Sequence, residues 1–582
     1  MMLNAVSENF DLWGSAHTTK SASGRGSSSK LDLHGIKKLR ELILELAVRG
    51  KLVQQDSEDE PASALLERVS AEKARLVKEE KLKTNAGSVI NSDDKYIDVP
   101  DSWGYCRLGN LAKFIDYRGK TPKKISSGVK LITAKNIRFG YISSEPEEFI
   151  SEEEYDSWMT RGFPKKGDIL FTPEAPLGNV AIIEMDERFA LAQRAICFQL
   201  HEPNVAPFLK ILIMSTAFQL QLKLNSTGMT ATGIKASKLK EIPIPIPPQA
   251  EIERIVTKVN ELMALCDQLE KQQTNSITAH QTLMEELLAT LTNSTSTDEV
   301  AENWARIAEH FDTLFTTEHS VDQLKQTILQ LAVMGRLVPQ SPEDEPASVL
   351  LEKIAAEKAQ LVKDKKIKKQ KSLPVITEEE KPFALPQGWV WVRLGTVLKK
   401  ITDGTHHSPP NGESGDYLYI SAKNIKPTGI QLSNATYVSQ VVHDEIYSRC
   451  DPEFGDILYI KDGATTGIAT INTLEKPFSM LSSVALLKCP DEVINSFVLL
   501  SLRSPYFYKE MRAGMTGVAI TRVTLKKLNN AFIALPPKNE QLRIVSQVNE
   551  LMTLCNTLKS QIHQTQTTQL QLANAMVEQA VA

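Results

Sequence analysis

The sequence of 582 residues has few of the features that mark secreted, membrane or disulfide-linked proteins. It contains no run of 18 or more apolar residues, so we expect no transmembrane helix. The first twenty residues have neither the basic start nor the apolar stretch of a signal peptide. The six cysteines show no C-x-x-C spacing, which argues against a disulfide framework and a zinc ribbon. A reducing, cytoplasmic location without a membrane partner is the expected setting.

Signatures of catalysis and of cofactor binding are also missing. Residues 119–121 (GKT) resemble the end of a phosphate-binding loop, but Phe114 stands where its first glycine would be. No G-x-G-x-x-G, Ser/His/Asp or paired-carboxylate arrangement can be read from the sequence. His406 and His407 could suggest a metal, yet neighbouring side chains of a strand point to opposite faces and no third ligand is apparent. We therefore expect no catalytic residue, metal or cofactor in this chain.

The sequence does contain a duplication. Residues 36–83 return as residues 321–368, with 28 of the 48 aligned positions identical. A second block from Pro247, PPQAEIERIVTKVNELMALCDQLE, returns from Pro536 as PPKNEQLRIVSQVNELMTLCNTLK. Between these blocks each half holds about 150 residues that hardly resemble the other half. The displacement between the copies changes only from 285 to 289 residues, which predicts one fold used twice with altered surfaces.

The repeated blocks predict helices. From Ile252 onward, apolar residues recur in alternating steps of four and three, which is typical of a coiled-coil seam. Neither glycine nor proline interrupts residues 249–293 or 538–582, so each could be one helix of roughly 60–65 Å that starts at a Pro-Pro pair. Cys266 and Cys555 lie on these stripes as expected core thiols. The residues expected to form the spacer and partner-binding helices are Ile255, Val259, Leu262 and Leu269, and in the second copy Ile544, Val548, Leu551 and Leu558.

Each variable segment reads as a mixed α+β domain. It begins after a Pro-x-x-Trp turn, at Pro100 or Pro386, and alternates short β-like runs with turns rich in Gly, Pro and Asp. One helix-like stretch then follows, at residues 208–224 or 497–511. Shorter amphipathic helices are predicted before these segments, from about residue 36 to 49 and from about residue 62 to 83.

Charge is segregated locally, although the net charge is only −4. Residues 113–138 hold eight Lys or Arg against one acid, and the next stretch turns acidic. A basic edge of this kind can contact phosphates without making the domain basic overall. In the second variable segment the basic residues cluster toward its C-terminal end. The residues expected to bind DNA are Arg118, Lys120, Lys123, Lys124, Lys135, Asn136, Arg138, Lys423, Asn424, Arg522 and Lys526.

Two of these positions have an alternative interpretation. The AKNI sequences place Asn136 and Asn424 at matching points after a β-like run. An asparagine can form two hydrogen bonds with adenine, which favours base reading. It can equally form a turn at the end of a strand, and the sequence leaves both open. The basic run at residues 363–371 is more simply a solvated helix tail than a DNA contact.

Taken together, these motifs resemble the specificity (S) subunits of type I restriction–modification enzymes. The resemblance rests on ELAVRGKLV and QLAVMGRLV, the DEPAS-LLE blocks, the Pro-x-x-Trp turns and the I-P-I-P-I-P-P…E…IV…VNELM segment, and it covers nearly the whole chain. It implies two target recognition domains, each reading one half of a split, asymmetric sequence in double-stranded DNA. It also implies antiparallel helices that separate these domains and dock two modification (M) subunits. S-adenosylmethionine would then belong to M, and ATP and Mg to the partner subunits, including the restriction (R) subunits.

With this resemblance the expected fold class is α+β, with two mixed recognition domains separated by long antiparallel coiled-coil helices and an internal pseudo-two-fold repeat. The competing interpretation is a protein–protein scaffold with two variable interaction domains. A two-domain enzyme is disfavoured because no reactive set of residues is found. The expected divisions are an N-terminal helical region at 1–95, recognition domain 1 at 96–247, a central helical spacer at 248–372, recognition domain 2 at 373–537 and a C-terminal helix at 538–582.

Overall fold

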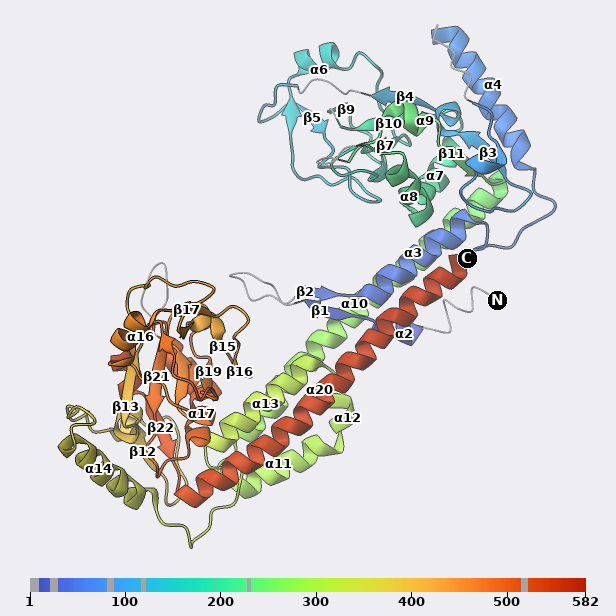
Figure 1. The fold of residues 1–582 in the computed structure, drawn as a ribbon. Helices are drawn as coiled ribbons and strands as arrows, with labels where there is room; N and C mark the ends of the chain where they lie inside the picture. Colours follow the sequence, from blue (N-terminus) through green and yellow to red (C-terminus); the bar gives the residue numbers. More distant parts are fainter. Residues whose placement is uncertain are drawn as a thin grey trace. The chain divides into compact units, whose positions relative to one another are not determined.

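The computed structural model describes residues 10–20, 30–80, 88–116, 122–192, 194–227, 232–513 and 522–581. The chain divides into two units, Met1–Ser276 with Thr565–Ala582, and Ile277–Gln564. Each unit holds one variable segment, one copy of the short repeated helix and a part of both long helices (Figure 1). Among the described residues no single helix is long and apolar enough to cross a membrane, and one bent pair, Pro203–Met214 with Thr216–Leu224, passes by length and composition only.

The helical part of the second unit consists of α13 (Glu318–Val333), α11 (Thr297–Glu309), α12 (Phe311–Leu314), the end of α10 (Gln249–Asn293) and the first part of α20 (Lys538–Val581). Both long helices have the extents that the absence of Gly and Pro predicts. They share an apolar cluster in which Leu288 of α10, Ile328 of α13 and Val548 of α20 are buried together. Most of the stability of these helices therefore comes from their packed stripes.

Polar contacts in this unit give the directions of the helices. Lys559 and His563 of α20 contact Asp322 and Glu318 of α13 at 2.6 and 3.0 Å, so the two helices run in opposite directions. Residue numbers along α10 and α13 rise together. His280 of α10 bonds the carbonyl of Leu314, which precedes α13, and Arg336, which follows α13, donates to the Thr292 carbonyl of α10. In this unit α10 is therefore antiparallel to α20, as predicted.

The helical part of the first unit uses α3 (His34–Val48), α4 (Ala62–Glu80), α2 (Phe10–Ser15) and the hairpin of β1 (Thr18–Lys20) with β2 (Lys30–Asp32). In the second unit, α14 (Ala347–Lys363) is the sequence repeat of α4. Arg40 on α3 contacts Asp267 and Glu270 of α10 at 2.6 and 2.9 Å. The helix α3 ends before Gly50, whose φ of +63° is the left-handed conformation that glycine adopts most easily.

The first variable domain contains one two-stranded pair and two larger sheets. Strand β3 (Gly104–Arg107) pairs with β11 (Pro243–Ile246) and brings the two ends of the domain together. One sheet has the order β4 (Ala112–Asp116), β10 (Ile196–Leu200), β7 (Ile169–Phe171) and β8 (Val180–Ile182). The other has the order β6 (Phe149–Ile150), β5 (Val129–Ile132) and β9 (Phe189–Leu191). The helices are α5 (Leu108–Leu111), α6 (Glu152–Trp158), α7 (Ala206–Met214), α8 (Thr216–Leu224) and α9 (Ala236–Lys240).

The second variable domain repeats this topology. Strand β12 (Val390–Arg393) pairs with β22 (Phe532–Leu535). The larger sheet has the order β13 (Lys400–Asp403), β21 (Val484–Lys488), β18 (Ile457–Ile460) and β19 (Ala469–Ile471). The smaller sheet has the order β17 (Thr436–Val438), β14 (Tyr417–Ile420) and β20 (Ser479–Met480). The remaining elements are β15 (Ile425–Lys426), β16 (Gly429–Ile430), α15 (Leu394–Val397), α16 (Gln440–Tyr447), α17 (Asn495–Arg503), α18 (Pro505–Arg512) and α19 (Leu525–Asn530). The prediction of one fold used twice is therefore confirmed by the matching strand orders.

The prediction of a single helix late in each variable segment is wrong, because each stretch forms two helices. Residues 208–224 lie in two helices, α7 and α8, and residues 497–511 lie in α17 and α18. Ser215 and Ser504 cause the breaks, because each has an extended backbone and its side chain accepts a hydrogen bond from the third residue of the following helix. Pro505 then occupies the first position of α18, where a proline is tolerated.

Candidate nucleic-acid interface and partner groove

Each variable domain is joined to a long helix by the same buried hydrogen-bonded group. Trp103 Nε1 donates to Glu251 Oε2 at 3.0 Å, and Gln55 Nε2 donates to Glu251 Oε1 at 2.6 Å. Glu251 lies in the first turn of α10 and is fully buried. Burial raises the pKa of its carboxyl, while the two hydrogen bonds act in the opposite direction. This Trp–Glu–Gln group therefore fixes the start of the domain against the start of the helix.

The second unit carries the same group at the repeat positions. Trp389 Nε1 donates to Glu540 Oε2 at 3.0 Å, and Gln340 Nε2 donates to Glu540 Oε1 at 3.0 Å. Burial again raises the pKa of the glutamate carboxyl. Residues displaced by 285 to 289 positions form the same group in both units. The two domains are therefore attached to their long helices in the same manner.

A second contact attaches each domain to the short helix of its unit. The backbone N–H of Ala217, at the start of α8, donates to Glu45 Oε1 of α3 at 2.9 Å. At the matching place, the N–H of Tyr506 donates to Gln330 Oε1 of α13 at 3.0 Å. The two contacts have nearly the same length, but the acceptor is a carboxylate in the first unit and a neutral amide in the second.

The predicted basic residues of the first domain differ in their surroundings where the structure describes them. Arg118 and Lys120 lie outside the described residues. Lys124 is paired with Glu148 at 2.7 Å, whereas the Lys123 side chain is exposed. Lys135 and Arg138 are exposed on the turn after β5, next to the exposed rings of Phe139 and Tyr141. Basic side chains beside exposed aromatic rings can hold a phosphate backbone and stack on bases.

Asn136 and Asn424 have structural roles in both domains. These residues are 2% and 1% exposed. Asn136 Oδ1 accepts hydrogen bonds from the N–H and the hydroxyl of Thr133, and its Nδ2 donates to the carbonyls of Ser143 and Pro146. Asn424 bonds Ser421 and the Gln431 carbonyl in the same manner. The structure therefore favours the turn, the second of the two interpretations, because the amides that would read a base are buried and satisfied.

In the second domain Lys423 and Lys526 are exposed, as a surface contact with DNA requires. Arg522 is 63% exposed and lies with its Nε 3.9 Å from Asp462. It belongs to a cluster of charges whose other members were not predicted to bind DNA. This cluster, which we call the Asp403 cluster, consists of Asp403, His406, Arg449, Lys461, Asp462 and Arg522.

The first domain has charged residues at the corresponding edge. Arg161 corresponds to Arg449 at a displacement of 288, and it donates to the Asp116 carbonyl at the end of β4. Glu174 forms a bridge with Gly233 and contacts Arg194 at 3.2 Å, and its counterpart Asp462 forms the matching bridge with Arg522. The identical arginine at one displacement within otherwise divergent segments is the sequence signal that would have found this edge.

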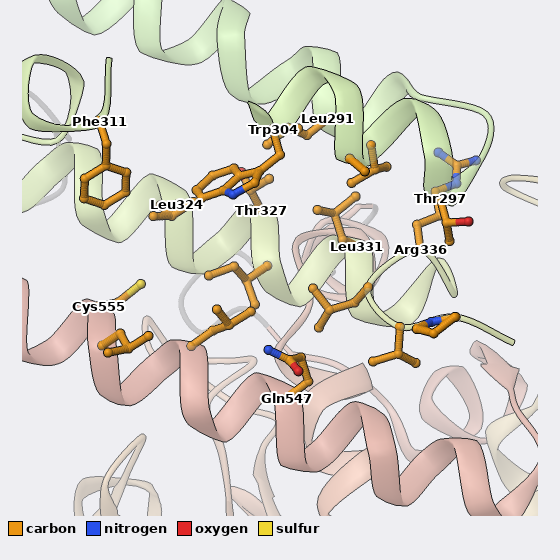
Figure 2. A pocket seen from close by; sticks show the side chains of 18 of the residues that line it. Leu291, Thr297, Trp304, Phe311, Leu324, Thr327, Leu331, Arg336, Gln547 and Cys555 are labelled. Carbon is orange, nitrogen blue, oxygen red and sulfur yellow. The ribbon is translucent and has the colours of Figure 1, made fainter. Parts of the chain in front are cut away.

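An apolar groove lies in the helical part of the second unit, between α11, α13 and α20 (Figure 2). Its volume is about 700 Å³. Figure 2 shows Trp304 of α11 and Leu324 and Leu331 of α13 on one side and Gln547 and Cys555 of α20 on the other. Leu554, which also lines the groove, is 61% exposed. A groove bounded by helices with apolar walls suits the apolar face of another helix.

The residues expected on the spacer helices lie as the stripe requires. Ile255, Val259, Leu262, Ile544 and Val548 are buried, and Leu269, Leu551 and Leu558 are half-buried. Cys266 and Cys555 are buried as well, and burial raises the pKa of the Cys266 thiol to about 11. Leu551, Cys555 and Leu558 of this stripe also line the groove.

No group of three His, Cys, Asp or Glu side chains with the spacing of a metal site occurs among the residues that the structure describes. His406 is instead a neighbour of Asp403 and Arg449, at 3.3 and 3.0 Å. Two domains of one fold with different charged edges, held on a repeated helical frame, define a protein built from two variants of one domain.

Comparisons with known proteins agree with this class. The model of the type I restriction modification DNA specificity domain matches residues 100–279 and 386–565. The type I restriction enzyme EcoAI specificity subunit of Escherichia coli is 40% identical over 99% of both chains, and the EcoEI specificity subunit of the same organism is 37% identical over 99% of both. The HsdS subunit from Thermoanaerobacter tengcongensis, a solved structure, is 20% identical over 83% of this chain and 97% of that chain, with a TM-score of 0.38. The chain belongs to the family of type I restriction enzyme specificity subunits.

Proposed function

We propose that this chain reads a bipartite, asymmetric target in double-stranded DNA, one half with each variable domain, and directs methylation and restriction by partner subunits. The observation that carries the proposal is the pair of domains with matching strand orders and matched attachments but different charges at the same edge. Equal scaffolds hold the two domains in equivalent ways, whereas unlike side chains specify unlike half-sites. We assign the two recognition domains to residues 96–247 and 373–537, and the helical parts to 1–95, 248–372 and 538–582.

Phosphate contacts are proposed for the exposed basic residues on these domains. Such contacts add affinity without sequence preference and weaken with salt. The described residues proposed for this role are Lys123, Lys124, Lys135, Arg138, Lys423, Arg522 and Lys526, with Arg118 and Lys120 proposed from the sequence. We expect a smaller effect from Lys124 than from Lys123, because Glu148 already pairs with Lys124.

A domain exchange tests the division between the halves. Replacing residues 97–247 with the corresponding domain of another specificity subunit should change one half of the methylated sequence and leave the other half unchanged. Sequencing of methylated sites in cells that also contain the M subunit measures the result. A change in both halves, or in neither, would contradict the assignment of one half-site to each domain.

A charge change tests the proposed basic edge. The K123A and K135A double variant should weaken binding to all duplexes and reduce the slope of log affinity against log salt by about two, one for each lost phosphate contact. A matched control is K366A with K368A, in the run that is more simply a solvated tail. If the control lowers the slope equally, the edge has no special part in DNA binding.

The partners are proposed to be two M subunits and the R subunits, with S-adenosylmethionine, ATP and Mg bound on those subunits and no catalytic residue in this chain.

The apolar groove supports a docked helix of an M subunit. Leu554→Asp should abolish this docking, because a carboxylate would face Trp304 and Leu551 without a partner. Leu542→Asp is the matched control, since Leu542 is 50% exposed on the same helix and does not line the groove. Light scattering of the mixed subunits separates the outcomes, and equal complex formation by both variants would contradict the groove as a docking site. A scaffold without DNA recognition would bind M but no duplex.

A further inference from the structure

A short turn of the first variable domain presents two aromatic rings to solvent. We call it the aromatic turn; it spans residues 137–142, whose first and last members form an antiparallel bridge. Phe139 is 45% and Tyr141 62% exposed. Lys135 and Arg138 are exposed as well, so basic side chains flank the rings. The turn therefore combines apolar surface with positive charge.

Hydrogen bonds hold the aromatic turn against the larger sheet. Asn179 Nδ2 donates to the Ile137 carbonyl at 2.8 Å, and the Gly140 N–H donates to the Val180 carbonyl at 2.9 Å. Val180 begins β8, and the connection that leads to it from β7 also carries Glu174 of the charged edge described above. The aromatic turn is thus fixed in position beside that edge.

The fold does not require these rings. The second domain forms the matching turn at a displacement of 288 residues, where β15 pairs with β16. In place of Phe139 and Tyr141 it has Pro427 and Gly429. An apolar side chain stabilises a fold by the area that it removes from water, and both rings keep much of their area in water. Their surface is therefore available to a ligand.

We propose that the aromatic turn enters the major groove of the first half-site and that Phe139 contacts the C5 methyl group of a thymine there. This methyl is the apolar group that bases present in the major groove, and phenylalanine is among the side chains that contact it. The groove also admits a two-stranded ribbon, which is the form of this turn. Lys135 and Arg138 match the negative charge of the phosphates on either side. This inference rests on the proposed function.

The exposure of Phe139 distinguishes this contact from a wedge. Aromatic and aliphatic side chains also engage duplexes by insertion between base pairs from the minor groove, which kinks the DNA. More than half of the surface of Phe139 is already covered by its own domain. The ring can therefore pack against a neighbouring methyl group, but it does not project far enough to separate two base pairs.

The test uses the full chain assembled with its M subunits and duplexes that contain the target. Each thymine in the half-site of the first domain, as identified by the domain exchange, is replaced in turn by deoxyuridine, which lacks only the C5 methyl. Wild-type affinity should fall about fourfold at one of these positions, as the burial of one methyl group implies. F139A should bind the thymine and deoxyuridine duplexes equally, and F139L should retain part of the preference. Unchanged wild-type affinity at every thymine, or a half-site without an A·T pair, would overturn the inference.

A graft tests the same contact in a turn that is known to form. The variant R138K/F139P/G140T/Y141G gives the first domain the turn sequence of the second and keeps the charge at position 138. All four residues change together, because the left-handed glycine is Gly140 in one turn, with φ +102°, and Gly429, one position later, in the other, with φ +133°. The graft should lose the preference for thymine and leave the second half-site and the salt slope unchanged.

The matched control is F163A. Phe163 is 50% exposed in the same domain, but its carbonyl accepts a hydrogen bond from Gln199, near the end of β10 that lies away from Asp116 and the charged edge. F163A should keep the wild-type preference, and loss of the preference in this variant would overturn the inference. Equal weakening of all duplexes by F139A, with loss of DNA bending, would identify a wedge and overturn it as well. If the wild-type complex binds no duplex in preference to another, the proposed function fails instead.

Discussion

Replacing Glu251 by glutamine should loosen the attachment of the first variable domain and leave that of the second unchanged. The carboxylate accepts one hydrogen bond from Trp103 and one from Gln55, at 3.0 and 2.6 Å. A glutamine keeps one acceptor and turns an NH2 group toward the other donor. Gln55 cannot rotate its amide without loss, because its Oε1 also accepts a hydrogen bond from Ser102.

The magnitude follows from the loss of one charge-assisted hydrogen bond in a buried site. Such bonds contribute about 1.5–3 kcal/mol, and an unsatisfied buried donor costs a similar amount. Removal of a buried charge offsets part of this cost, as the raised pKa of Glu251 indicates. We expect a net loss of about 1–2 kcal/mol in the free energy that opens this attachment.

Hydrogen exchange measured by mass spectrometry checks the expectation. In E251Q, peptides covering residues 98–108 should exchange about 5- to 30-fold faster, as 1–2 kcal/mol implies. Peptides covering residues 384–394 contain Trp389 and serve as the internal control, and E540Q should produce the reverse pattern. Equal acceleration of both peptides in either variant, or no acceleration in both, would refute the role of these carboxylates in the attachment.

Three other predictions concern ionisable side chains and the length of α10. The pKa of Glu251 is raised in the folded state, so its contribution to stability is largest below its unfolded value of about 4.5 and is lost as pH rises through the folded value. The destabilisation by E251Q should therefore be larger at pH 5 than at pH 7.5 in urea unfolding, and a larger effect at pH 7.5 would contradict the sign. Burial raises the pKa of the Cys106 and Cys266 thiols to about 11. Iodoacetamide at pH 8 should therefore label them only after denaturation. Rapid labelling of the native chain would contradict this prediction. Four residues inserted after Lys271, within α10, add about one helical turn and should change the unread gap of the methylated target by about one base pair, so an unchanged gap would contradict the helix as the element that sets the spacing.

Prediction from the sequence works where the signal is local or repeated. The alternating apolar steps after Ile252 and the absence of glycine and proline give the two long helices nearly to their ends. It fails where a single residue redirects the chain. Ser215 is compatible with a helix by composition, but as a capping residue it ends one helix and starts another.

The candidate site shows the same division. Exposed lysines such as Lys135 can be chosen from charge clustering, because an isolated surface charge requires no particular partner. Asn136 cannot be assigned in this way, since its role depends on whether its amide meets a base or the carbonyls of its own turn.

By itself, the sequence determined that the chain is a duplicated frame of helices with two divergent α+β segments. The reason is that helical periodicity and internal identity are properties of neighbouring or equally displaced residues. Only the tertiary structure decided which distant side chains meet: Trp103 with Glu251, and Asp403 with Arg449 and Lys461. These contacts depend on where strands end and on which charges are removed from water together, and neither property is encoded in any short stretch of sequence.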